Sequence, residues 1–390
     1  MGFGSKLSKS KIKDIRMDKF TRKTSFEQWF SPISNELFNE LVENLQLDYY
    51  TKKLYMTPFL KLLLFAQLHE TESLRALSDA VFSGNLQKSI GFESISFSQL
   101  GRKLNEVPTS FFETIFLDLV AQIHEKTNFQ SRRKTSTPWM LIDSTTLPLN
   151  LTNHKWAEFR KTKSGVKLHL RLAFMEKGLS YPDKAIFTNA IEHDRGQLEV
   201  LVDDKDCLYV FDRGYLDYGR FDQMTDDGYF FVSRLRKNAV VRVIETLEIP
   251  SDSSVLSDEM VVLGSTQNRT EHVFRKIKVR DDKGKELVLI SNRFDISAVE
   301  IADVYKARWA IELFFKWMKQ HLCIKKFYGH SEQAVHNQVY VAMIAYCLNV
   351  LAQLNTNSSR TYLQISRYLK AAIWDSAHIW TRKIKGKGVP

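Results

Sequence analysis

Three acidic residues stand where carboxylates could carry out joint chemistry. Asp143 ends the apolar run 139–142 and Asp212 ends the run 208–211, so both are expected at strand termini, where α/β sheets bind ligands. Glu312 lies on a separate segment with helical spacing. Taken singly, each aspartate is more typical of a turn or a helix cap. Taken together, the hard carboxylate oxygens suit Mg²⁺ or Mn²⁺, and a pair of such ions supports phosphoryl displacement.

The segment that carries Glu312 is predicted to be a helix with a defined start. Ser297 and Glu300 have the spacing of a capping box, which fixes the first turn. At about 100° per residue, the polar side chains fall on one narrow stripe, which holds Arg308, Glu312, Lys316 and Lys319. The rest of the circumference is mostly apolar, so we predict a buried helix whose stripe faces a polar cleft or partner charges. The alternative is an ordinary ion pair between Arg308 and Glu312.

Basic side chains beside these acids would have a task in the same chemistry. Arg308 can hold a phosphate through its planar fork, and Lys319 can act as a point charge. Acids alone predict a metal site, whereas acids flanked by cations predict phosphodiester chemistry.

Residues 1–135 have helical spacing and are predicted to form a helical N-terminal domain. Serines at 73 and 96 open two of its helices, an arrangement compatible with a helix-turn-helix-like pair that binds DNA. Arg102 and Lys103 on the second helix are candidate DNA contacts. The alternative is that both lie on the solvated face of a helical bundle.

The rest of the chain divides by its periodicity into four segments. A polar linker at 130–138 leads into short β-rich runs alternating with helices over 136–236, which predicts an α/β layer. Residues 237–295 are strand-like without helices and contain a predicted hairpin turn at 281–284, so they form a β-rich insertion. The Glu312 helix occupies 296–330, and 331–390 is helical with a basic tail. A basic strand of the insertion favours DNA contact over protection of a sheet edge: Arg275, Lys276, Lys278 and Arg280.

Composition limits the classes of binding partner and the cellular location to be expected. The 390 residues carry a formal net charge of +11, which favours a polyanion such as nucleic acid or an anionic membrane. The three separated cysteines indicate neither a disulfide framework nor a zinc site, and they fit a reducing cytoplasm. No apolar run follows the early lysines, so no secretory signal is expected. The apolar centre at 339–351 is too short for a membrane span and is predicted to be a buried helix, so no membrane partner is expected.

The helix residues also match a known signature. Tyr305-x2-Arg308-x3-Glu312-x6-Lys319 resembles the Tyr-Arg-Glu-Lys motif of the IS-four family of bacterial DDE transposases. The run 212–215, Asp-Arg-Gly-Tyr, is similar to the second-acid motif of that family, and 141–145 is similar to its first-acid strand. Lys167-x-His169 resembles the following strand of the family more weakly, and the run 231–235 is also similar to the family. The resemblance covers about residues 136–330.

The resemblance implies an RNase H-like catalytic core within an α/β chain. Asp143, Asp212 and Glu312 would be the catalytic acids and would bind two divalent ions, Mg²⁺ with Mn²⁺ as a substitute. Tyr305, Arg308 and Lys319 would contact phosphates near the cleaved end, with Arg213 beside the second acid. The expected partners are double-stranded DNA, as transposon ends and target, and a second copy of the chain in a synaptic complex. The expected location is the bacterial cytoplasm, on the nucleoid when the chain is bound to DNA.

One position departs from the family. Some relatives hold a flipped base with a tryptophan of the insertion, but no Trp occurs here between Trp156 and Trp309. Tyr229, Phe230 or Phe274 could stack in its place. Two other functions compete with transposition: an RNase H-like nuclease without strand transfer, and a sequence-specific DNA-binding protein without catalysis. The presence of all three acids argues against the second.

Overall fold

The structure is a computed structural model, and it describes residues 23–127, 137–175, 179–192, 194–249, 253–281, 283–321 and 327–385. The predicted linker at 130–138 falls almost entirely outside these residues, as do the early lysines and the end of the basic tail. The chain forms two compact units, one of residues 1–127 with 321–390 and the other of residues 128–320. Each unit is described separately.

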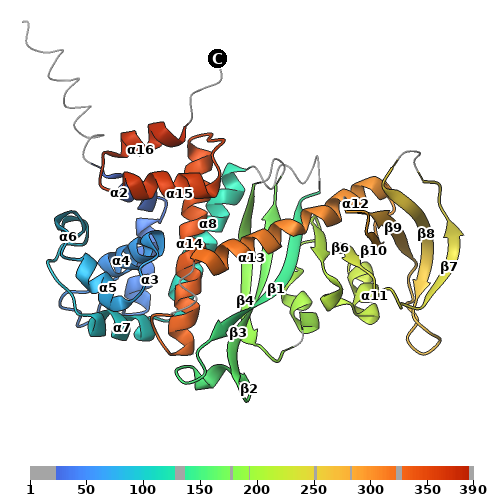
Figure 1. Ribbon diagram of the computed structural model, residues 1–390, viewed down its shortest axis with the longest axis horizontal. Coiled ribbons are helices and arrows are strands. Elements are labelled where there is room, and N and C mark those ends of the chain that lie inside the picture. Colours follow the sequence, from blue (N-terminus) through green and yellow to red (C-terminus); the bar gives the residue numbers. More distant parts are fainter. Residues whose placement is uncertain are drawn as a thin grey trace, which may run out of the picture. The chain divides into compact units, whose positions relative to one another are not determined.

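The first unit is helical and is built from both ends of the chain. Its helices are α2 (Ser25–Phe30), α3 (Asn35–Asn44), α4 (Met56–His69), α5 (Leu74–Ala80), α6 (Gly84–Ile90), α7 (Phe97–Glu106), α8 (Thr109–Lys126), α14 (Glu332–Asn355), α15 (Tyr362–Ala371) and α16 (Ala377–Ile384). The sequence separated the N-terminal and C-terminal helical regions. In the structure they share one core, because α14 packs against both α8 and α4 (Figure 1).

Helix α14 is the central helix of this unit. Its 24 residues and apolar composition are enough by themselves to cross a membrane, so the apolar centre defined from the sequence was too short. However, 89% of its most apolar window is buried inside the protein, as in the core helix of many globular proteins. Its polar Asn337 is also buried and donates to the carbonyl oxygens of Leu104, at 3.1 Å, and Val107, at 2.8 Å, at the end of α7. The prediction of a buried helix is confirmed.

The second unit contains one ten-stranded mixed sheet. Its strands are β1 (Trp139–Leu149), β2 (Glu158–Arg160), β3 (Lys163–Phe174), β4 (Ser180–Asn189), β5 (Leu208–Phe211), β6 (Phe230–Arg234), β7 (Val241–Thr246), β8 (Val255–Leu263), β9 (Phe274–Arg280) and β10 (Glu286–Ser291). They run in the order β2-β3-β1-β5-β6-β10-β9-β8-β7, with β4 also paired to β3. Strands β1, β5 and β6 are parallel neighbours, and the other pairs are antiparallel.

Helices of this unit follow or cover the sheet. They are α10 (Leu198–Leu201), α11 (Tyr218–Asp226), α12 (Ala298–Ala307) and α13 (Trp309–His321), with 3₁₀ turns η1 (Lys155–Ala157), η3 (Asp194–Gln197) and η4 (Arg213–Tyr215). Helix α12 contacts β6, β8 and β10 (Figure 1). The predicted capping box is present, because the Ser297 side chain accepts from the Glu300 backbone and Glu300 accepts from that of Ser297.

The region 237–295 is strand-like, as predicted, but its strands β7 to β10 extend the main sheet. Strand β10 pairs with β6, and β9, β8 and β7 follow in turn, so hydrogen bonding is continuous from β1 to β7. The predicted hairpin turn is also present. Gly284 has φ +77° there, a conformation that glycine adopts without a steric penalty.

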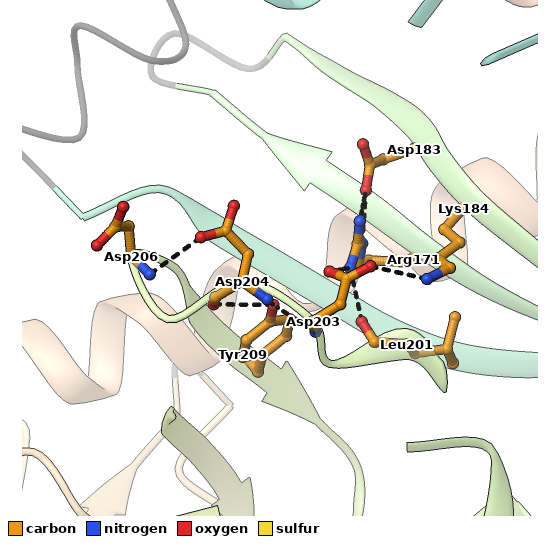
Figure 2. Close-up of polar contacts among 8 residues, drawn as sticks. All are labelled: Arg171, Asp183, Lys184, Leu201, Asp203, Asp204, Asp206 and Tyr209. Atoms are coloured by element: carbon orange, nitrogen blue, oxygen red, sulfur yellow. Dashed lines mark hydrogen bonds and ion pairs between the residues drawn. The ribbon is translucent and has the colours of Figure 1, made fainter. Parts of the chain in front are cut away.

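Ion pairs of the buried Arg171 join the segments before β5. Arg171 of β3 bonds Asp183 of β4, the carbonyl oxygen of Leu201 at 2.7 Å, and Asp203 (Figure 2). Burial alone would lower the pKa of Arg171, but Asp183 and Asp203 outweigh it and raise the pKa above its ordinary value. This cluster connects β3 and β4 to the segment that leads into β5, the strand before Asp212.

Candidate active site

The parallel pairing of β1 and β5 brings two of the three predicted acids together. The pairing ends with Ile142 opposite Phe211, so Asp143 and Asp212 occupy the next position on neighbouring strands. Neighbouring strands lie about 4.8 Å apart. Asp212 follows the end of β5, as predicted.

The predicted position of Asp143 at a strand end was wrong. Strand β1 continues to Leu149, because residues beyond Ile142 remain paired with β3 on the other side. Asp143 nevertheless lies where the parallel pairing stops. On the side facing β5, its surroundings are therefore those of a strand end, which is where open sheets place ligands.

Arg308 connects the third acid to the first. Its Nη1 lies 3.1 Å from Asp143 Oδ2, and its Nη2 bonds Glu312 Oε1. The Arg308–Glu312 pair was predicted from the spacing, whereas the bond to Asp143 was not. Arg308 lies in a turn between α12 and α13, so the predicted single helix is interrupted at this residue. Burial by itself lowers the pKa of Arg308, but Tyr305, Glu312 and Asp143 outweigh it, so the guanidinium stays charged.

Tyr305 reaches the second acid. Its hydroxyl donates to Asp212 Oδ1 at 3.4 Å, and its ring lies 5.6 Å from the guanidinium carbon of Arg308. Burial, followed by the charge of Asp212, raises the pKa of Tyr305 to about 12 although Arg308 lowers it. The phenol therefore keeps its proton at neutral pH.

Electrostatic coupling among the acids is visible at Asp143. Burial raises its pKa to about 6, and the charges of Asp212 and Glu312 add to that effect. The backbone N–H of Ser144, at 2.8 Å, and the Arg308 guanidinium act in the opposite direction. Carboxylates that raise one another's pKa are a good site for a cation.

Asp143 and Glu312 open into a depression of about 450 Å³ that also contains Lys316 and Lys319. Both lysines are exposed, so the charged stripe faces an open polar site as predicted. The prediction that the rest of the helix is buried was wrong on one side. Trp309 and Leu313 are 59% and 51% exposed, while the opposite face of α13 is buried.

The other predicted DNA contacts have different environments. Arg213 is exposed immediately after Asp212, and Arg102 is exposed on α7. Lys103 is buried, and its Nζ donates to the carbonyl oxygen of Leu47 at 2.8 Å and to Asp48 at 3.0 Å. The structure therefore gives Lys103 an internal role, because the apolar face of α7 turns this side chain inward.

Most cations of the β9 strand also have internal partners. Arg275 is buried against Asp258, Lys276 pairs with Glu259, and Lys278 pairs with Glu286. These pairs neutralise part of the basic surface. Strand β9 lies between β8 and β10, so the alternative of protecting a sheet edge is wrong, and DNA contact by this strand stays a prediction. The acids in these pairs come from β8 and β10, and they meet the β9 cations only through the register of the strand pairing.

Sequence reasoning missed one further acid near the site, Asp194. Its Oδ1 accepts from the Ser144 hydroxyl at 2.7 Å and lies 2.8 Å from Lys167 Nζ. Asp194 follows β4 in a polar stretch that resembles an ordinary turn. Only the pairing of β1, β3 and β4 brings it close to Ser144.

The residues present fit a hard divalent cation in chemistry. Three carboxylates interact electrostatically, and a guanidinium supplies positive charge between two of them. Among the described residues, no three His, Cys, Asp or Glu side chains are close enough together to hold a metal ion. Asp143, Asp212 and Glu312 would have to move closer together than they are around Arg308.

A mixed sheet that presents carboxylates beside basic side chains is typical of enzymes that act on phosphodiesters. Family comparison agrees. The family model described as "Transposase DDE domain" matches residues 135–348, and a family described as a domain of unknown function matches residues 21–93.

Individual relatives point the same way. The chain is 33% identical over 289 residues, 73% of each protein, to "Probable transposase for insertion sequence element IS5377" of Geobacillus stearothermophilus. It is 32% identical over 254 residues to "Putative transposase y4zB" of Sinorhizobium fredii, covering 64% of this chain and 69% of that one. A solved structure of the piggyBac transposase synaptic complex with hairpin DNA matches at a TM-score of 0.46 and 11% identity, covering 95% and 84% of the two chains. This chain belongs to the DDE transposases of the IS-four type, and it is therefore an enzyme, a DNA transposase.

Proposed function

We propose that this transposase binds the terminal inverted repeats of its own insertion sequence, cleaves the DNA ends with two divalent ions, and joins the 3′-hydroxyl ends to target DNA. The observation that carries the proposal is the gathering of Asp143, Asp212 and Glu312 around Arg308 and Tyr305. Family membership makes DNA the substrate, and the three acids are the proposed reaction centre.

Asp143, Asp212 and Glu312 are the residues proposed to hold Mg²⁺, or Mn²⁺ in its place. When bound, such a pair of ions activates an attacking oxygen and stabilises the leaving oxygen of a phosphodiester. The protein would fix the ligands from two strands and one helix. Burial of Asp143 also supports binding, because a carboxylate with a raised pKa gains more from a neighbouring cation.

The cationic side chains are proposed to position the DNA backbone. Lys319 is exposed at the depression and can meet a phosphate as a point charge. Arg308 can offer its fork to a phosphate when its carboxylate partners turn to a metal. Tyr305 keeps its proton and can donate to a phosphate oxygen. Arg213 and Arg102 are exposed and remain proposed DNA contacts. Lys103 is not a proposed contact, because its ammonium donates to Asp48.

The finer organisation remains part of the proposal. We place an RNase H-like core in 136–236 and 296–330, interrupted by 237–295, with DNA binding assigned to the helical N-terminal domain 1–135 and a helical region at 331–390. The parallel pairing of β1 and β5, which stops next to Asp143 and Asp212, supports such a core. We also propose a homodimer in the synaptic complex, and a cytoplasmic protein that is associated with the nucleoid when bound.

Substitution of each acid tests this proposal. Asp143→Asn, Asp212→Asn and Glu312→Gln should each lower cleavage by at least about a thousandfold, because each removes one charged ligand. Binding to end DNA should remain, since the cations are intact. Gel-resolved cleavage with Mg²⁺ and a binding titration without it measure the two effects. Glu259→Gln, a similarly exposed carboxylate of β8, is the matched control and should cleave normally.

Product analysis separates the competing functions. Joined products with Mg²⁺ are expected for a transposase. Cleavage without joining would identify a nuclease, and specific binding without cleavage would identify a DNA-binding protein. Full cleavage by any of the three acid variants would remove that residue from the site.

A further inference from the structure

We propose that Asp194 is a positioning residue, which holds the Asp143 carboxylate in place through Ser144. The inference rests on the proposed function, because it takes Asp143 to be a metal ligand. It assigns a task to a side chain that belongs to none of the three matched motifs.

The register of the sheet places Asp194 and Asp143 on opposite faces of β1. Ser144 of β1 lies opposite His169 of β3, and the pair Thr146–Lys167 follows two residues along. Directly opposed residues of an antiparallel pair point to the same face, and successive residues alternate. Ser144 therefore shares one face with Lys167 and His169, whereas Asp143 points to the other face, where it meets Arg308.

Ser144 links the two faces through its own atoms. Its backbone N–H donates to Asp143 Oδ1 at 2.8 Å, and its hydroxyl donates to Asp194 Oδ1 at 2.7 Å. Anchoring the hydroxyl restrains Ser144, and with it the N–H group that holds the Asp143 carboxylate. Asp194 thus acts on the metal site without being placed in it.

Asp194 is itself held firmly. Lys167 Nζ lies 2.8 Å from its Oδ1 and also donates to the carbonyl oxygen of Glu192 at 3.0 Å. His169 is fully buried beside it, with Nδ1 at 3.5 Å from Oδ1 and Nε2 at 2.8 Å from Thr188 Oγ1. A carboxylate that accepts from the Ser144 hydroxyl and the Lys167 ammonium, beside the buried His169, is held more firmly than a surface ion pair, which is generally worth little.

Asp194 also lies beside the turn that carries the second acid. A β-carbon added to Gly214, two residues after Asp212, would stand 3.6 Å from Asp194 Oδ2. The carboxylate therefore lies close to both acid-bearing segments of the sheet. Ligands of a metal are commonly oriented by such hydrogen-bonded partners, whose loss weakens the metal site.

Isothermal titration calorimetry of the full chain with Mn²⁺ alone tests this role. Asp194→Ala should weaken Mn²⁺ binding by about tenfold, and Ser144→Ala should do the same. The double variant should be no weaker than either single variant, because both act through one hydrogen bond. Asp194→Asn keeps an oxygen that can accept from Ser144, and it should restore most of the affinity.

Glu259→Gln is the matched control. Glu259 is 20% exposed and pairs with Lys276, much as the 23% exposed Asp194 pairs with Lys167, but it serves no acid of the site. Its Mn²⁺ affinity should equal that of the wild type. If Asp194→Ala does not fold, as judged by its thermal transition, Ser144→Ala and Asp194→Asn carry the test.

The outcomes distinguish the two proposals. Unchanged affinity in Ser144→Ala or Asp194→Ala, or additive losses in the double variant, would overturn the positioning role and leave the metal site intact. A loss in Asp194→Asn equal to that in Asp194→Ala would also overturn it, because charge and not the hydrogen bond would then matter. Absence of Mn²⁺ binding by the wild-type chain would remove the proposed metal site and this inference with it.

Discussion

Arg308 has two roles in the candidate site, one toward the acids and one toward DNA. Without metal or DNA it neutralises Asp143 and Glu312, and in the proposed complex it faces a phosphate. Both tasks require a charged group with several donors, which lysine supplies less well because it lacks the planar fork. The Tyr-Arg-Glu-Lys spacing predicted that Arg308 belongs to the site. Its bond to Asp143 was not predictable, because the two residues lie on segments far apart in the sequence.

Removing Arg308 should weaken DNA binding in a way that depends on salt. Arg308→Ala loses one phosphate contact, so we expect about tenfold lower affinity for end DNA and a log–log salt slope smaller by about 0.9. Fluorescence anisotropy at several salt concentrations measures both, on end DNA that is already cleaved and with Mg²⁺ present so that the carboxylates can turn to the metal. Arg242→Ala removes the same charge from an exposed position on β7 and should change little. An unchanged slope in Arg308→Ala would exclude a phosphate contact.

Single residues also mark the limit of sequence reasoning. Asp143, Asp212 and Glu312 were recognisable because each follows or occupies a patterned segment. Lys103 was not recognisable as internal, because a lysine on a helix is usually solvated and its partner Asp48 lies on a distant loop. Asp194 was missed for the same reason, since a carboxylate in a turn has no distinguishing pattern.

At the level of helices and strands, helix caps and turns were predictable from the sequence, whereas the pairing of strands was not. The helix starts at Ser73 and Ser96, the capping box at Ser297 and the glycine turn at Gly284 are present, because each depends on residues within four positions. The length of β1 was underestimated, because its polar half is stabilised by pairing with β3. The continuity of β7–β10 with the main sheet likewise depends on one strand pair, β10 with β6.

The β8–β9 pair should depend strongly on one buried ion pair. Arg275 bonds Asp258, which is fully buried, and also donates to the carbonyl oxygen of Ile296, just before the cap of α12. Arg275→Met would leave Asp258 buried and unpaired, at a cost of about 3–5 kcal/mol in the free energy of unfolding. Urea denaturation measures this loss.

A paired substitution serves as the control for that experiment. Arg275→Met with Asp258→Leu removes both charges and should recover most of the stability, because neither partner is left unpaired. Arg280→Ala, at a side chain 55% exposed, should change the free energy of unfolding by less than about 0.5 kcal/mol. A small effect of Arg275→Met alone would show that water reaches Asp258.

At the scale of the whole molecule, the two chain ends fold as one unit. Ser25 N donates to the Asp375 carbonyl oxygen at 2.8 Å, and Trp29 Nε1 donates to Asn349 Oδ1 at 3.1 Å. Composition and periodicity identified both ends as helical. They could not show a shared core, because the apolar pattern of a helix shows which face is buried but not which helix packs against it.

This shared core predicts how fragments of the chain behave. Residues 1–127 alone should lack a cooperative thermal transition, because α8 would expose the face that α14 covers. Phe116 would lose its ring contact with Tyr340 at 5.9 Å, and Glu113 its hydrogen bond from the Tyr340 hydroxyl at 2.9 Å. Adding residues 321–390 in trans should restore a cooperative transition by circular dichroism. Residues 128–320 contain a complete sheet and should melt cooperatively by themselves. Cooperative melting of 1–127 without its partner would show that α14 is dispensable to the fold of this unit.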